Sequence, residues 1–163
     1  MGQELDLYID TPLPVGAVDA LVKRCPADGP DGWYARGLQL IEAVDLRGRS
    51  SLSSDSHRDR FGFVPTVMVW SQLRREIDPE PDGGLPGMNT FLAIAGRLLA
   101  TVPGDAAMVQ NSDYVFLYRR AGVVTLQRDW PTDKNRDSLA IPHRLAEFPY
   151  EGGPEALVVV DAL

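Results

Sequence analysis

Hydrophobic and polar residues alternate at the start of the chain. Between Glu4 and Asp10, the apolar residues Leu5, Leu7 and Ile9 are separated by mostly acidic positions. Alternation with a period of two predicts a β-strand that has one face in the core and one face toward water. We therefore expect the acidic residues of this strand, Asp6 among them, to be solvated.

Two later segments have the three-to-four-residue spacing of amphipathic helices. The first runs from Val15 to Lys23, and the second runs from Met88 to Val102, with Asn89 or Thr90 as the expected N-cap. The apolar stripe of the second segment is wide, which is typical of a helix that packs against a sheet. Prolines follow both segments and end them.

Further alternating or β-rich segments predict the rest of the sheet. The expected strands are Leu38–Leu46, Phe61–Arg75, Ala106–Asn111, Tyr114–Arg120, Val123–Asp129 and a short final run at Ala156–Val160. In the first of these, Leu38, Leu40, Val44 and Leu46 are expected on one face, together with Glu42. Pro65 lacks a backbone donor, so it marks an edge position or a bulge in the second.

Residues 47–60 and 76–87 are expected to be flexible loops. The former is serine-rich with almost no apolar residue, and the latter combines acids with proline and glycine. No composition shift marks a linker, so we expect residues 1–163 to form one domain. The predicted fold class is α+β, with a largely antiparallel sheet and two main helices packed on one face.

Composition restricts the function classes. The formal net charge of the 163-residue chain is −7, which disfavours binding to nucleic acid or to an anionic membrane. Cys25 is the only cysteine, so no disulfide can form within the chain. The N-terminal residues lack a basic and an apolar signal region, and the apolar runs are too short to span a membrane. We therefore expect a cytoplasmic protein.

No motif has the residue types and spacing of a known catalytic, metal or cofactor site. His57 lies beside serines but without a strand–turn–helix context, and no EF-hand or phosphate-binding loop occurs. We therefore expect a non-catalytic protein without cofactor or metal. One alternative stays open, namely a small-ligand-binding protein or an enzyme with a site near Glu42 and His57.

Protein binding is the better-supported class. Acidic loops and partly exposed aromatic residues are typical contact features, because Trp and Tyr anchor interfaces and acids steer basic partners. The residues predicted to contact a partner are Trp33, Tyr34, Trp70, Glu76, Asp78, Glu80 and Asp82. A further alternative is a module that self-associates through the edge strand marked by Pro65.

Three short motifs resemble those of a known family. They are RFGFVPTV at residues 60–67, VPGDA at 102–106 and YRRAGVV at 118–124. Over about residues 60–130 their order is similar to that in the Sit-type bacterial immunity proteins of swarming and kin discrimination. The resemblance implies a cytoplasmic, non-catalytic protein that binds and neutralises a cognate polypeptide toxin, with a basic toxin as the complement of an acidic antagonist.

Overall fold

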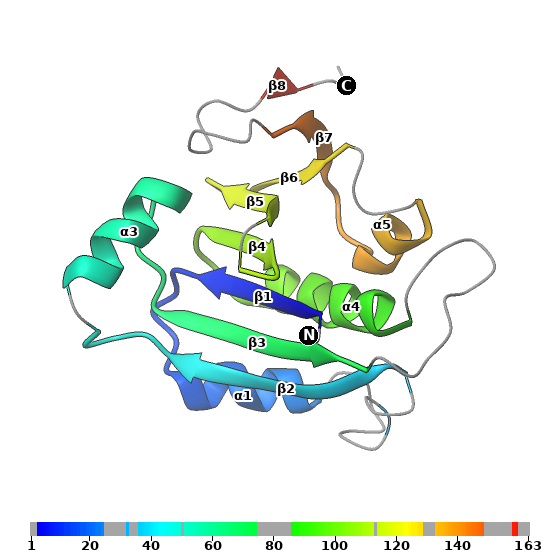
Figure 1. Ribbon diagram of the computed structural model, residues 1–163, viewed down its shortest axis with the longest axis horizontal. Helices are drawn as coiled ribbons and strands as arrows, with labels where there is room; N and C mark the ends of the chain where they lie inside the picture. Colours follow the sequence, from blue (N-terminus) through cyan, green and yellow to red (C-terminus); the bar gives the residue numbers. More distant parts are fainter. Residues whose placement is uncertain are drawn as a thin grey trace.

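The computed structural model describes residues 3–24, 32, 36–49, 51–74, 86–112, 114–128, 133–148 and 158–159. Within them the strands are β1 (Glu4–Ile9), β2 (Leu38–Asp45), β3 (Val67–Leu73), β4 (Ala106–Gln110), β5 (Tyr114–Arg120), β6 (Val123–Gln127), β7 (Arg144–Glu147) and β8 (Val158–Val159) (Figure 1). The helices in the same part of the chain are α1 (Val15–Lys23), α3 (Ser51–Phe61), α4 (Pro86–Thr101) and α5 (Asp133–Leu139).

The strands form one sheet in the order β2-β3-β1-β4-β5-β6-β7-β8. Every neighbouring pair is antiparallel except β6 and β7, which are parallel. The predicted α+β class, with a largely antiparallel sheet, is confirmed. The first strand of the chain lies in the interior of the sheet, between β3 and β4.

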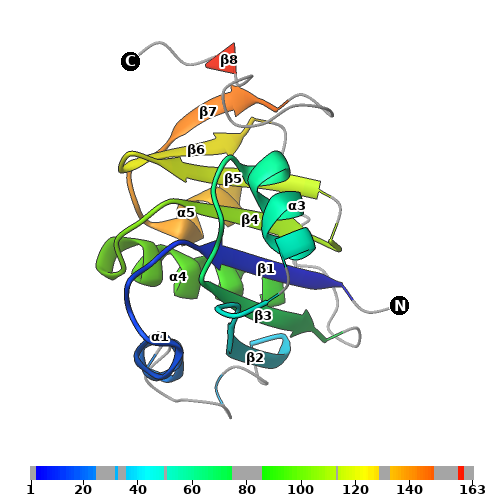
Figure 2. The same cartoon turned by 90° about the vertical axis from the view of Figure 1, so that its left-hand side faces the viewer.

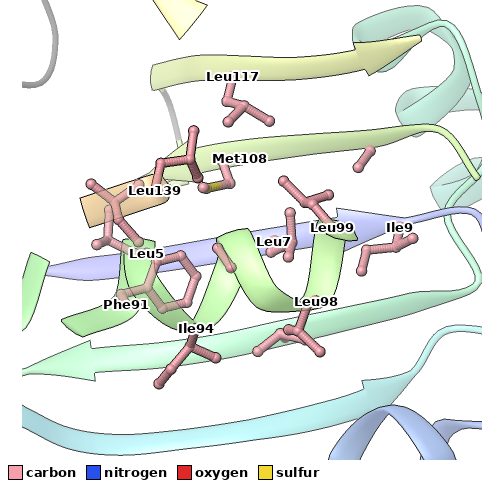
Figure 3. Close-up of a cluster of buried hydrophobic side chains, with 14 of the residues drawn as sticks. Leu5, Leu7, Ile9, Phe91, Ile94, Leu98, Leu99, Met108, Leu117 and Leu139 are labelled. Atoms are coloured by element: carbon pink, nitrogen blue, oxygen red, sulfur yellow. The ribbon is translucent and has the colours of Figure 1, made fainter. Parts of the chain in front are cut away.

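The main core lies between the sheet and three helices. Leu5, Leu7 and Ile9 of β1 are fully buried against α4, and side chains of α1 and α5 complete the same cluster (Figure 3). The predicted apolar faces of β1, α1 and α4 are confirmed. The expected N-cap of α4 is wrong, because the helix begins at Pro86, whose missing N–H costs nothing in a first turn.

Helix α3 lies on the opposite face of the sheet from α4 (Figure 2). The expectation of a flexible loop over residues 47–60 is wrong for the part from Ser51 onward. The helix has almost no apolar periodicity to reveal it, and its buried anchor is its last residue, Phe61. Phe61 packs with Phe63 and Tyr118 in a second, smaller core cluster. The prediction of two main helices on one face is therefore incomplete, because α3 lies on the other face.

Strand β2 has a different inward face from the predicted one. The pairing with β3 shifts between Leu38 and Leu40, so that Ile41 is buried while Leu40 is 40% exposed. A single extra residue moves every following side chain to the other face. Glu42 therefore points away from the main core. The sequence had predicted this acid on the apolar face of the strand, and the shift in pairing explains why it is not buried there.

The prediction that Pro65 marks an edge position or a bulge within a strand is also wrong. Strand β3 begins after this proline and pairs with β1 on one side and β2 on the other. The edge strand beside β3 is β2, where the side chain of Asp19 on α1 accepts a hydrogen bond from the N–H of Ala43 at 3.2 Å. Because this backbone N–H already has a partner, the edge is less able to pair with a strand of another chain.

The last part of the chain contains more structure than its pattern predicts. The polar stretch after Trp130 includes α5 and is followed by β7, and neither was expected. The meander of β4, β5 and β6 and the terminal strand β8 are confirmed. None of the helices in the described ranges combines the length and the apolar content needed to cross a bilayer.

Candidate functional site

The three sequence motifs meet at one end of α4. The guanidinium of Arg119, a buried side chain on β5, donates to the carbonyl oxygens of Leu99, Val102 and Gly104. These carbonyls lie at the C-terminal end of α4, where helical carbonyls have no intrahelical partner. Burial lowers the pKa of Arg119, and the nearby carboxylate of Asp105 opposes this shift. The arginine therefore acts as a buried cap on the helix.

The neighbouring arginine joins the other two motifs. Arg120 donates to the carbonyl oxygen of Phe61 at 3.0 Å and lies 3.6 Å from a carboxylate oxygen of Asp105. The other oxygen of Asp105 accepts from the N–H of Ala121 at 3.2 Å. All three motifs are thus tied together by hydrogen bonds. The polar side chains of these motifs therefore serve to hold the fold together.

A shallow depression of about 610 Å³ lies beside this junction. Its wall includes Val102, Gly104, Arg119, Gly122 and Pro142. The one buried cation in the wall already donates to three backbone carbonyls, so an anionic ligand would have to compete with them. We therefore interpret the depression as a feature of the fold and not as a ligand-binding site.

A second group of side chains forms a row across the opposite face of the sheet. Glu42, Trp70, Asp6 and Val109 pair directly across β2, β3, β1 and β4, so they point to the same side. Figure 1 looks onto this face, with α4 behind the strands and α3 at the left end. Exposure falls along the row, since Glu42 is exposed, Trp70 is half-buried and Asp6 is 3% exposed.

Asp6 is the most perturbed carboxyl group that the structure describes. Its pKa is raised to about 7: burial is the largest cause and the charge of Glu4 acts in the same direction, while a backbone hydrogen bond from Ser71 and the charge of Arg60 oppose the shift. Its Oδ1 accepts no hydrogen bond from any described residue. A buried acceptor without a donor is costly, and such groups are enriched at functional sites.

Tyr8, which the charge of Asp6 influences, belongs to an aromatic cluster on the α3 side. The ring of Tyr8 lies 5.4 Å from the ring of His57 and 5.0 Å from that of Phe61, measured between centroids. Burial and the charges of Arg60 and Arg49 lower the pKa of His57, which favours the neutral imidazole at pH 7. Burial and the charge of Asp6 raise the pKa of Tyr8.

Comparison with known families shows which family this chain belongs to. A family model described as SitI3-like matches residues 4–135. The chain belongs to the SitI3-like family. The match confirms the resemblance to Sit-type immunity proteins, and it contains the three motifs and the row from Glu42 to Asp6. No curated protein and no solved structure matches the chain.

Most of the predicted partner contacts of this SitI3-like protein lie outside the described residues. These are Trp33, Tyr34, Glu76, Asp78, Glu80 and Asp82. The seventh, Trp70, lies half-buried in the row on the face of the sheet opposite the main core. Sequence reasoning missed Asp6, because an acid in an alternating strand indicates a solvated position.

The structure does not bring Glu42 and His57 together. Glu42 lies on the edge strand opposite Trp70, whereas His57 packs on Tyr8 of β1 at the α3 side. No group of three or more His, Cys, Asp or Glu in the described ranges could hold a metal ion. Among the described residues of this SitI3-like protein, we define the Trp70 face as Leu40, Glu42, Met68, Trp70 and Gln72, which share one side of β2 and β3.

Proposed function

We propose that this protein is an immunity protein that binds a cognate polypeptide toxin and neutralises it by direct complexation in the cytoplasm. The observation that carries the proposal is the SitI3-like match over residues 4–135. In this proposal the protein acts without catalysis and without a cofactor. Trp33, Tyr34 and the acids at positions 76, 78, 80 and 82 remain predicted contacts.

The Trp70 face supports this function with the chemistry of an interface. Leu40 is one of two large apolar side chains that the described part of the chain exposes, and it lies beside the acid Glu42 and the half-buried Trp70. Aromatic anchors ringed by polar groups carry much of the energy of protein interfaces. A net charge of −7 would also attract a basic toxin at long range.

Co-expression tests the proposal. A toxin gene should lie next to the gene for this protein, and cells that produce the toxin should grow only when the protein is co-expressed. Growth arrest in the presence of well-expressed, folded protein would contradict the proposed function.

A matched pair of variants locates the surface. Leu40→Arg places a cation on the Trp70 face, and Val123→Arg places one at the other large exposed apolar residue, 45% exposed at the start of β6. Both sites are exposed, so both variants should fold. We expect Leu40→Arg to reduce protection, because it removes apolar contact area and repels a basic toxin. Val123→Arg should protect like the wild type, and equal effects of the two variants would remove the Trp70 face from the proposal.

A further inference from the structure

We propose that the row Glu42, Trp70 and Asp6 receives an arginine side chain of the toxin, with the guanidinium donating to Oδ1 of Asp6. This inference rests on the proposed function, because it names the chemistry of the partner at that surface. Three observations carry it: the graded exposure of the row, the missing donor to Oδ1 of Asp6, and the aromatic residue between the two acids.

The row leads from solvent to a buried acceptor. Glu42 is exposed at the sheet edge, Trp70 is half-buried on the next strand, and Asp6 is buried on the strand after that. Neighbouring strands lie about 4.8 Å apart, so the row from Glu42 to Asp6 is about 10 Å long. A long side chain that enters from the edge would meet a carboxylate, then an indole, then a second carboxyl.

Arginine fits this sequence of groups better than any other side chain. Its planar guanidinium stacks on aromatic faces, stays charged, and offers five donors to carboxylate oxygens. Trp70 supplies the preferred aromatic ring for a cation. Oδ1 of Asp6 has no donor among the described residues, so an incoming N–H would satisfy a group that folding leaves unpaired.

The free protein conceals the acceptor. Oδ1 of Asp6 is inaccessible to solvent, so uptake of a guanidinium requires a side chain of this row to move. The raised pKa of Asp6 means that the free carboxyl is largely protonated below pH 7, and a bound cation would drive its ionisation. Binding should therefore release a proton.

Other titratable and charged groups face the same side of the sheet as Asp6. Glu4 and Tyr8 lie on β1, His57 and Arg60 on α3, and Arg49 before α3; Tyr118 on β5 and Glu42 on β2 face the same side of the sheet. Burial lowers the pKa of His57 and raises the pKa of Tyr8, so it shifts both groups toward their neutral forms. β4 contributes only Ala107 and Val109 to this side.

A capped Gly-Arg-Gly tripeptide tests the site without any toxin. The probe is titrated to about 20 mM while the indole N–H signal of Trp70 is followed by NMR, with Trp70→Phe used to assign the signal. We expect a saturable shift for the wild type, a loss of that shift in Asp6→Asn, and a weaker shift for the Gly-Lys-Gly peptide. The matched control is Glu147→Gln, which removes one exposed charge on β7 and should leave the shift unchanged. The absence of a shift, or an equal shift in Asp6→Asn, overturns the inference.

Titration of the toxin separates this inference from the proposed function. Asp6→Asn should weaken the complex by at least about 30-fold, because it removes one partner of a buried charge pair. Calorimetry in buffers of different ionisation enthalpy should detect proton release near pH 6 for the wild type and none for the variant. A tight complex that Asp6→Asn leaves unchanged would overturn the arginine site and keep the proposed function. A tripeptide shift without any toxin complex would do the reverse.

Discussion

The buried guanidinium of Arg119 donates a hydrogen bond of 2.7 Å to the carbonyl oxygen of Val102, and this bond joins strand β5 to the end of helix α4. The same guanidinium reaches Leu99 and Gly104. One side chain thus satisfies backbone groups from the last turn of α4 to the turn that follows it. The motifs that reveal the family are for this reason mainly determinants of the fold.

Replacing Arg119 should destabilise the protein strongly. Arg119→Met leaves three carbonyl oxygens without their side-chain donor, and we expect a loss of about 2–4 kcal/mol in the free energy of unfolding. Arg119→Lys keeps the charge but cannot span all three acceptors, so it should also destabilise. Urea denaturation measures both, with the exposed Arg144→Lys as control. Equal stability of Arg119→Met and the wild type would contradict the capping role.

The buried carboxyl of Asp6 should make stability depend on pH. Its pKa is about 7 in the folded protein against 3.8 for the ordinary group, so the folded state binds the proton more tightly. The free energy of unfolding should therefore fall as the pH rises from about 4 to about 7 and then become level.

Asp6→Asn removes this ionisation without a change of shape. At pH 8 we expect the variant to be more stable than the wild type by about 1–4 kcal/mol, and at pH 4 the difference should nearly vanish. Thermal unfolding across this pH range measures the difference. As control, Asp137→Asn alters an exposed acid and should follow the wild-type profile. A variant that is less stable at pH 8 would contradict the account of Asp6.

Two helical glycines should respond to alanine in opposite directions. A Cβ atom at Gly96 of α4 would lie 1.8 Å from the carbonyl oxygen of Leu139 on α5, whereas a Cβ at Gly16 of α1 meets nothing within 4 Å. Alanine favours a helix over glycine by about 1 kcal/mol. Gly16→Ala should therefore be neutral or stabilising, while Gly96→Ala should cost about 2–4 kcal/mol by separating the helices. Chemical denaturation of both variants measures their free energies of unfolding. Similar values for the two variants would contradict the close contact of α4 with α5.

The sequence predicted the fold correctly where the apolar periodicity of a segment matches the burial of its side chains. The alternation of β1 and the wide stripe of α4 predicted the apolar faces that form the main core. Helix α3 was missed because its segment has no apolar stripe, and its anchor Phe61 acts only once β4 and β5 lie beneath it. The face of β2 was predicted wrongly because a shift in pairing between Leu38 and Leu40 leaves no mark in the residue pattern.

The candidate site was harder to predict than the fold. Trp70 was identified from its residue type, but the burial of Asp6 depends on the covering of both faces of β1, which a single strand cannot indicate. Its pairing with Trp70 follows from the register of β1 and β3, and this register forms between segments more than 60 residues apart. Local pattern therefore located the aromatic residue and missed the buried acid beside it.

Direct titration of the purified protein with the toxin encoded next to its gene tests the central claim most directly. Calorimetry of the wild type should show a saturable complex that Leu40→Arg weakens and Val123→Arg does not. The absence of any binding by folded wild-type protein would contradict its assignment as an immunity protein that acts by direct complexation.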